Sequence, residues 1–411
     1  MKFVHKEANP TPIVDTVFKI VELAKKAKEQ YGSENVVDAT IGSLADEQGN
    51  LVALQTVFET YNNIEPKIKA AYANSFVGNP NYRKQVAHWL FNDIKLDIAH
   101  SVIATPGGTG AVSTTLHCCL SKGETALFPE IAWGSYKLMA QEYGFETLTY
   151  QLFEEDHFNL TDFKLKCQQV MDKQNKLVVI INDPCHNPTG YSLTQEEWTQ
   201  VIQILNDCSK QGPVILLNDI AYIDYSYCLE TTHKYMETFN EVSDNVAVVI
   251  AFSCSKTLTS YGLRVGAAVI LAKHPIDVKE IEMIFEKHAR ATWSNIANAG
   301  MENFVRVTTT GYKEFMREKD SYIQLLKQRS DIFVEEAKAC NLPIYPYKEG
   351  FFVTLQMPNN EVREKYHQAL MQNNIFTVQV NKGIRVAVCS ISVEKVKGLA
   401  KRLKEVYDSL D

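Results

Sequence analysis

The chain lacks the sequence features of several protein classes. No window approaches the run of about 20 apolar residues that a membrane-spanning helix needs, and residues 1–20 hold no continuous apolar run like that of a signal peptide. The 9 cysteines include no Cys-x-x-Cys pair, and an odd number does not suit a disulfide framework. The few Cys/His neighbours lack the spacing of metal ligands. We therefore expect a cytoplasmic protein with no membrane partner and no metal site.

Basic clusters flanked by aromatic residues are also missing, and the formal net charge at pH 7 is −7. We therefore expect no nucleic-acid partner. Apolar sequence is abundant, because 45% of the 411 residues are hydrophobic, which is enough for a large buried core. The length favours two or more domains.

Short apolar runs alternate with amphipathic helices through the middle of the chain. Thr194 and Glu197 have the spacing of a capping box at the start of a helix over 194–205, whose apolar residues share one face. Strands that alternate with helices predict an α/β domain with a mainly parallel sheet, in which ligands bind at the carboxyl ends of the strands. The predicted strands are 102–104, 125–128, 177–182, 214–218, 246–252 and 265–271.

The pattern changes after about residue 311. A long helix is predicted from about 311 to 340, and apolar runs that predict strands follow at 351–357, 375–380 and 384–390. The helical spacing of the apolar residues in 395–407 predicts one closing helix, with basic residues on its solvated face. This strand-rich tail predicts a second, smaller α+β domain.

The segment 252-FSCSKTLTSYGLRVG-266 places one lysine among potential phosphate ligands. Lys256 follows a buried strand, so desolvation favours its neutral amine, which can attack a carbonyl. Ser253 and Ser255 precede it and Arg264 follows eight residues later, and hydroxyl and guanidinium groups suit a phosphate dianion. A phosphorylated aldehyde that bonds to a lysine is pyridoxal phosphate. Ser-x-Ser-Lys alone is more often a surface turn, but Arg264 in register favours the cofactor site.

Two further strand ends carry polar side chains. Asn187 lies in an Asn-Pro-Thr-Gly turn after one predicted strand, and Asp219, with Tyr222 three residues on, ends another. Taken alone, each is an ordinary turn or cap. Asn187, Asp219 and Lys256 are separated by 32 and 37 residues, about one strand–helix unit each, so we expect them to meet in one crevice.

This ordered set resembles the fold-type-I pyridoxal-phosphate enzymes, and within them the aspartate and aromatic aminotransferases. The motifs His-Asn-Pro-Thr-Gly, Asp-x-Ala-Tyr and Ser-x-Ser-Lys-x-x-x-x-Tyr-x-x-Arg-x-Gly occur in the family's order. Other matching segments are 41-IGSLADEQGNLVAL-54, 107-GGTGA-111, Trp133, 290-RATWSN-295 and 383-GIRVAV-388. The resemblance implies a large cofactor-binding domain over 48–312, with a mostly parallel seven-stranded sheet flanked by helices. It also implies a smaller α+β domain built from both chain ends, 1–47 and 313–411.

The resemblance implies catalytic roles for Lys256, Asp219 and Tyr222. Lys256 would bond to the cofactor aldehyde, release it to the substrate amine and then carry the proton from the substrate Cα to the cofactor. Asp219 would keep the pyridine nitrogen protonated, so that the ring accepts electrons. Tyr222 and Asn187 would hydrogen-bond the ring oxygen and so help Lys256 to leave.

The cofactor phosphate is expected at the N-terminus of a helix. Gly108 and Thr109 open a predicted helix, whose free N–H groups and dipole favour an anion. The resemblance implies that Ser253 and Arg264 complete this phosphate site and that Trp133 stacks on the cofactor ring. A core position is the alternative for Trp133.

The remaining matches concern the substrate and a second subunit. Arg385 matches the arginine that grips the substrate α-carboxylate, with help from the N–H of Gly42, and an arginine within an apolar strand needs a carboxylate partner on physical grounds as well. Arg290 and Tyr72 match residues that, in relatives, reach across a homodimer interface to the substrate side chain and the cofactor phosphate. A surface ion pair is the alternative for Arg290. Tyr136 stands where many relatives have a histidine behind the cofactor aspartate.

The resemblance therefore implies an aminotransferase that works by ping-pong exchange. Aspartate or an aromatic amino acid is the expected donor, and a 2-oxo acid such as 2-oxoglutarate the expected acceptor. Because the cofactor motifs are shared with β-decarboxylases and lyases of the same scaffold, such a reaction is the alternative. A regulatory protein that uses this scaffold as a sensor would need a DNA-binding module, for which we see no room before Ile41.

Overall fold

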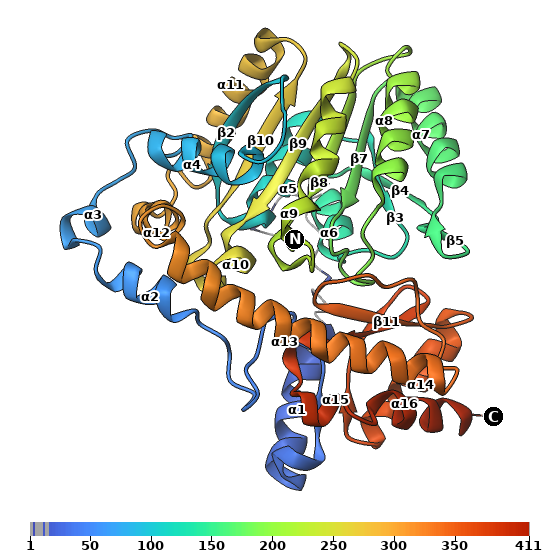
Figure 1. Cartoon of the computed structure of the whole chain (residues 1–411). Helices are drawn as coiled ribbons and strands as arrows, with labels where there is room; N and C mark the ends of the chain where they lie inside the picture. Colours follow the sequence, from blue (N-terminus) through green and yellow to red (C-terminus); the bar gives the residue numbers. More distant parts are fainter. Residues whose placement is uncertain (1–2, 5–10, 13–15, 411) are drawn as a thin grey trace.

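A seven-stranded sheet forms the centre of the larger part of the molecule (Figure 1). The computed structural model describes residues 3–4, 11–12 and 16–410. Strand β10 runs antiparallel to its neighbours β2 and β9, and the other neighbours pair in parallel, which confirms the predicted α/β class. In spatial order the strands are β2 (Ala99–Thr105), β10 (Gly266–Ala272), β9 (Val246–Ser253), β8 (Val214–Asp219), β7 (Leu177–Asn182), β3 (Thr125–Pro129) and β4 (Glu146–Tyr150).

Helices cover both faces of this sheet. One face carries α5 (Gly107–Cys119), α6 (Ser135–Glu142) and α11 (Pro275–Thr292), and the other carries α4 (Pro80–Phe91), α7 (Leu160–Gln174) and α8 (Gln195–Cys208). Alternate residues of β7 enter the two cores, Val178 and Ile180 the first, and Leu177, Val179 and Ile181 the second. Apolar side chains on both faces explain why the central strands are continuous apolar runs in the sequence. The predicted capping box of α8 is confirmed.

A smaller antiparallel sheet contains residues from the C-terminal part of the chain. Its strands are, in spatial order, β11 (Phe352–Gln356), β14 (Gly383–Ala387) and β13 (Val378–Val380). Near it, β1 (Val37–Asp38) pairs in parallel with β12 (Ile375–Phe376), and α1 (Thr16–Tyr31) packs against β12 and β13. Helix α1 and strand β1 therefore lie beside the C-terminal elements, as the resemblance implies, whereas the domain boundaries at 47/48 and 312/313 stay predictions.

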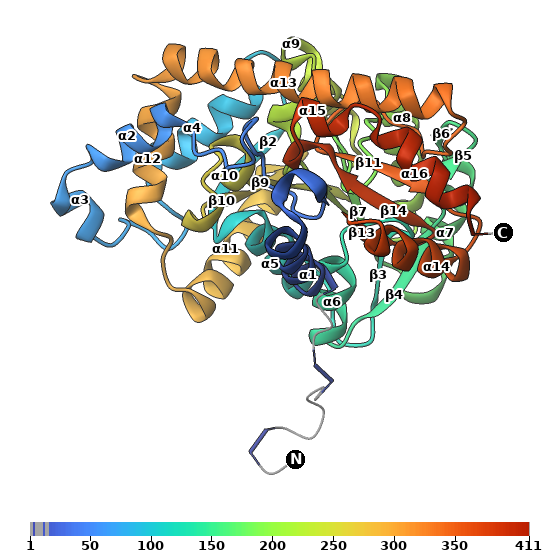
Figure 2. The same ribbon diagram turned by 90° about the horizontal axis from the view of Figure 1, so that it is seen from below.

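The long helix α13 (Tyr312–Ala339) extends along both parts of the molecule (Figure 2). It contacts α2 (Gln55–Asn62) and α12 (Asn298–Thr308) on the side of the large sheet, and α15 (Val393–Val396) and α16 (Leu399–Asp408) on the other. None of the described helices is long and apolar enough to span a membrane.

Three details of the sequence prediction were wrong. The single closing helix over 395–407 is two helices, because Gly398 adopts a left-handed conformation with φ 75° and its N–H donates to the Glu336 carboxylate. The run 375–380 is likewise divided into β12 and β13. Strand β4 was missed, because most of its residues are half-buried or exposed at the sheet edge and form no apolar run.

Candidate active site

A cavity of about 280 Å³ opens where β7, β8 and β9 end. This is the crevice at the carboxyl ends of parallel strands in which open α/β sheets bind ligands. The cavity brings together nine of the predicted residues: Gly108, Thr109, Trp133, Asn187, Asp219, Tyr222, Ser253, Lys256 and Arg264. The sheet register explains their proximity, since the last residues of β7 and β8, Asn182 and Asp219, are paired.

Lys256 lies on the short helix α10 (Cys254–Thr257), directly after β9. Its Nζ donates to the carbonyl oxygen of Gly42 at 2.6 Å and lies 5.1 Å from the ring of Tyr222 and 4.7 Å from that of Tyr261. Within the described residues no carboxylate pairs with this amine. Desolvation lowers the pKa of Lys256 to about 8. The neutral amine that attacks a carbonyl is therefore far more populated near neutral pH than it is for an exposed lysine.

Asp219 is the buried carboxylate of the cavity, with 5% of its surface exposed. Tyr136 donates its hydroxyl to Asp219 Oδ2 at 2.6 Å, and the N–H of Ala221 donates to Oδ1 at 3.1 Å. Burial raises the pKa of Asp219, while these two hydrogen bonds act in the opposite direction. Tyr136 thus contacts the aspartate from the position where the sequence comparison with the family expected a histidine.

The other end of the cavity is built for an anion. Helix α5 begins at Gly107 without a side-chain cap, so its first N–H groups are free to bind a ligand. The guanidinium of Arg264 lies so close that a Cβ on Gly107 would come within 2.6 Å of its Nη2, and the φ of 71° at Gly107 also favours glycine. Arg264 is oriented by donating to Ser255 Oγ at 2.9 Å and to Tyr261 O at 2.8 Å. A helix dipole and a guanidinium therefore converge on one place.

Arg385 reaches the site from β14 of the smaller sheet. Its Nη1 donates to Asn187 Oδ1 at 3.2 Å and its Nη2 to the carbonyl oxygen of Thr40 at 2.8 Å. The side chain is 9% exposed, its Nε has no partner, and no carboxylate of the described residues pairs with it. Burial lowers the pKa of Arg385. A buried guanidinium without a counter-charge is suited to bind a carboxylate ligand.

The structure does not bring Tyr72 and Arg290 into this cavity. Tyr72 is 85% exposed, and Arg290 is exposed with its guanidinium 4.8 Å from the ring centre of Phe76. Gly42 contacts Lys256 through its carbonyl oxygen. The roles expected for Tyr72, Arg290 and the N–H of Gly42 stay predictions.

Sequence analysis assigned no role to three residues that line the cavity, Asn182, Ala221 and Tyr261. Asn182 accepts the Asn187 N–H at 2.7 Å and donates to the carbonyl oxygen of Asp219 at 2.7 Å, so it fixes two strand ends relative to each other. Asn182 is the last residue of a predicted strand, and this position could have marked it as a residue of the crevice. Tyr261 accepts the N–H of Leu44 at 3.0 Å and so holds the N-terminal segment over the site. Tyr261 belongs to the sequence motif that contains Lys256, and this could have marked it as a residue of the site.

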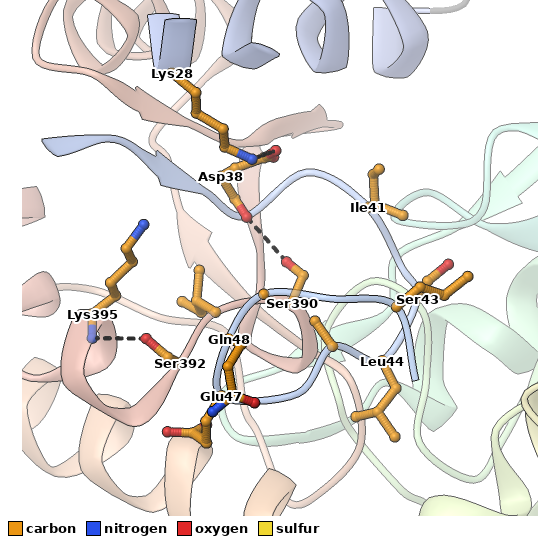
Figure 3. A pocket seen from close by; sticks show the side chains of 14 residues that line it. Lys28, Asp38, Ile41, Ser43, Leu44, Glu47, Gln48, Ser390, Ser392 and Lys395 are labelled. Carbon is orange, nitrogen blue, oxygen red and sulfur yellow. Dashed lines mark hydrogen bonds and ion pairs between the residues drawn. The ribbon is translucent and has the colours of Figure 1, made fainter. Parts of the chain in front are cut away.

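A second cavity, of about 270 Å³, lies between the N-terminal segment and the C-terminal elements (Figure 3). Its charged groups have hydrogen-bond or ion-pair partners within the chain. Lys28 forms an ion pair of 2.6 Å with Asp38, and Lys395 donates to the carbonyl oxygen of Val36 at 2.9 Å. Ser390 donates to the carbonyl oxygen of Asp38 at 3.1 Å (Figure 3). The first cavity lies at the carboxyl ends of parallel strands and contains the predicted residues, so it is the candidate active site.

The comparisons with known proteins agree with this site. The sequence pattern of the family "Aminotransferase class I and II" matches residues 34–403. The chain belongs to this family. A solved aminotransferase from Anaerococcus prevotii is 33% identical, with a TM-score of 0.95, and the match covers 99% of this chain and 100% of that one. The mitochondrial aspartate aminotransferase of Saccharomyces cerevisiae is 22% identical over 95% of this chain and 92% of its own length.

The tyrosine aminotransferase of Klebsiella pneumoniae is 28% identical over 62% of this chain and 64% of its own length. An aromatic-amino-acid aminotransferase from Burkholderia pseudomallei, described as covalently bound to pyridoxal phosphate, shares the fold at 20% identity and a TM-score of 0.76. As a class I and II aminotransferase, this protein transfers amino groups and uses pyridoxal phosphate. The cavity fits that cofactor, because it offers a lysine without a carboxylate partner, a buried carboxylate, and a Gly107 cradle that a Cβ would fill.

Proposed function

We propose that this aminotransferase moves the amino group of aspartate or an aromatic amino acid to 2-oxoglutarate by ping-pong exchange. The observation that carries the proposal is a pair of cations, the half-buried Lys256 and the buried Arg385, which have no carboxylate partner among the described residues. The Lys256 amine is suited to attack a carbonyl, and the Arg385 guanidinium is suited to bind a carboxylate. Relatives named as aspartate, tyrosine and aromatic-amino-acid aminotransferases support the donor class.

The residues near Lys256 in the cavity each have a role in this proposal. Pyridoxal phosphate, when bound, supplies an aldehyde for the substrate amine and a ring that withdraws electrons from the substrate carbon. Lys256 would hold the cofactor through its Nζ and, once the substrate amine has displaced it, would carry the proton from the substrate Cα to the cofactor carbon. Asp219 holds the ring nitrogen in its protonated form, and Tyr136 keeps the Asp219 carboxylate in place. Tyr222 and Asn187 donate to the ring oxygen.

The remaining cavity residues hold the cofactor in one orientation. Gly108 and Thr109, at the free N-terminus of α5, bind the phosphate together with Ser253 and Arg264. Trp133 covers one face of the ring. A phosphate fixed at this end leaves the aldehyde within the part of the cavity that Lys256 lines.

Arg385 binds the α-carboxylate of the substrate, with the N–H of Gly42 as a second donor. The guanidinium is already fixed by Thr40 and Asn187, so a substrate carboxylate does not have to order it. Because Asn187 also faces the cofactor cavity, this contact sets the substrate amine at a defined distance from Lys256.

We further propose a homodimer in which Tyr72 and Arg290 act in the partner's site. Support comes from their exposure in the single chain, and from Phe76, Met283 and Ile284, which are exposed large apolar residues of the same region. Mixing an inactive Lys256→Ala protein with an Arg290→Ala protein tests this. Shared sites predict that activity toward aspartate rises above the sum of the two proteins, and independent sites predict no gain.

We also propose a cytoplasmic location. All 9 cysteines are free thiols, as is usual in a reducing compartment. Cell fractionation tests the assignment, and recovery of the protein in a membrane or organelle fraction would contradict it.

Half-reaction spectroscopy tests the reaction class. An amino donor should convert the visible absorbance of the holoenzyme to that of the aminated cofactor, and 2-oxoglutarate alone should restore it. A β-decarboxylase or lyase would instead release product without a 2-oxo acid. The donor panel should contain aspartate, tyrosine and alanine. A preference for alanine over both others would contradict the proposed donor class.

A further inference from the structure

A buried ion pair lies next to the cavity and takes no part in the roles assigned above. Lys319, in the first third of α13, is 0% exposed, and its Nζ lies 3.3 Å from Asp224 Oδ1. The rings of Trp89, Tyr225 and Phe315 surround the amine with centres at 5.5, 5.6 and 5.3 Å. Burial lowers the pKa of Lys319, while the charge of Asp224 opposes that shift. Lysine is rarely buried so fully, which makes the pair unusual for a structural contact.

Asp224 is the centre of this cluster. It lies two residues after Tyr222, in the turn that follows β8, and is 3% exposed. Besides the Lys319 amine, its carboxylate accepts the Trp89 Nε1–H at 3.1 Å and the Thr257 hydroxyl at 2.5 Å. A buried carboxylate with two hydrogen-bond donors and one ion pair has one fixed orientation.

Thr257 connects this carboxylate to the catalytic lysine. It directly follows Lys256, closes the helix α10 and is 1% exposed. The hydroxyl of Thr257 donates to Asp224 and also lies 3.2 Å from the carbonyl oxygen of Ser253. Asp224 thus links the backbone that carries Lys256 to the turn that contains Tyr222 and directly follows Asp219.

We propose that Asp224, braced by Lys319, is a positioning residue for Lys256: through Thr257 it fixes the lysine relative to Tyr222 and Asp219. It touches neither substrate nor cofactor. Its effect is the geometry of the bond between Lys256 and the cofactor, and that geometry sets how easily the bonded nitrogen is protonated. The inference rests on the proposed role of Lys256. His233, whose pKa is lowered mainly by burial, is influenced by both charges of the pair and belongs to the surroundings that any pH titration of this region senses.

The test is the pH titration of the visible absorbance of the holoenzyme, which reports protonation of the Lys256–cofactor bond. Thr257→Val removes the hydroxyl and keeps the shape, and Thr257→Ser restores the hydroxyl. We expect Thr257→Val to shift the titration midpoint by about one pH unit, which corresponds to a tenfold change in the protonation equilibrium, and Thr257→Ser to return it to the wild-type value. Asp224→Asn should shift it in the same direction.

Thr238→Val is the matched control. Thr238 is also buried and its hydroxyl donates to a backbone carbonyl, that of Tyr235 at 2.7 Å, away from the cavity. It should lower thermal stability and leave the midpoint unchanged. If Asp224→Asn does not fold, the two Thr257 variants decide the question. A wild-type midpoint in Thr257→Val would overturn the inference, whereas a wild-type holoenzyme without any titrating absorbance would overturn the proposed role of Lys256 with it.

Discussion

Two lysines of the molecule lie among aromatic rings, the half-buried Lys256 and the fully buried Lys319, and their amines have different partners. Lys256 faces Tyr222, Tyr261 and Phe351, has a backbone carbonyl as its hydrogen-bond partner, and lines a cavity. Lys319 is enclosed by rings as well, but its amine is paired with Asp224. Desolvation lowers the pKa of both amines. The lowered pKa is therefore common to both lysines, and the missing carboxylate and the cavity distinguish Lys256, the proposed catalytic residue.

Two buried arginines repeat this difference. Arg329 of α13 forms an ion pair of 2.5 Å with Glu47 and donates to two backbone carbonyls. Arg385 of β14 has only neutral partners and one free Nε among the described residues. Lys319 and Arg329 of α13 have their counter-charges, Asp224 and Glu47, in the chain. Lys256 and Arg385 lack such counter-charges among the described residues, which is why we propose that a ligand brings the carbonyl and the carboxylate that they bind.

The largest expected effect is the loss of turnover when Lys256, but not Lys319, is replaced. Lys256→Ala removes both the nucleophile and the proton carrier, so turnover should fall by roughly 10⁴-fold or more, and the absorbance of the covalently bound cofactor should disappear. Lys319→Met should keep that absorbance. Spectra and turnover of the two purified variants test this, and a normal spectrum in Lys256→Ala would refute the site.

Arg385 should matter for substrates that carry a carboxylate. Arg385→Lys keeps the charge but loses the planar fork, so kcat/KM for the preferred amino acid should fall roughly 10²-fold, or about 3 kcal/mol. Reaction with an amine of the same side chain but without the carboxylate is the control. That reaction should change little, and an equal loss for both substrates would show that Arg385 has only a structural role.

The lysine of α13 should matter for stability instead. Lys319→Met leaves the Asp224 carboxylate buried without its cation, which should cost about 3–5 kcal/mol in the free energy of unfolding. Lys327→Met removes an exposed pair with Asp331 on the same helix and should cost less than about 1 kcal/mol. Urea unfolding of both variants measures the difference, and equal midpoints would mean that the buried pair contributes no more than a surface pair.

Much of this site follows from the sequence, because its residues end successive strands. Lys256, Asp219 and Asn187 could be placed in one crevice since parallel strands direct their carboxyl ends to the same edge. The Lys319–Asp224 pair could not be predicted, because charged residues on a long helix usually face solvent and its two members are distant in sequence. The break at Gly398 was missed because the apolar spacing of 395–407 continues through it. The apolar residues on both sides of the break, such as Val396 and Leu403, are nevertheless buried.

The smallest predicted effect concerns pH. Because burial lowers the pKa of Lys256 to about 8, the neutral fraction of the amine falls below that pH and approaches its maximum above it. The rate at which cofactor-free protein takes up pyridoxal phosphate should therefore fall about tenfold for each pH unit below about 8 and level off above about 9. Stopped-flow absorbance measures this rate. A rate that still rises up to about pH 10 would indicate a lysine with the ordinary pKa.

The central claim is that the cofactor aldehyde selects the lysine without a carboxylate partner. Reduction of the holoenzyme with borohydride fixes the cofactor on its lysine, and mass spectrometry of the digested protein then identifies that residue. The account predicts a single phosphopyridoxyl group on the peptide that contains Lys256. A modified Lys319, another modified lysine, or no modified peptide at all would contradict it.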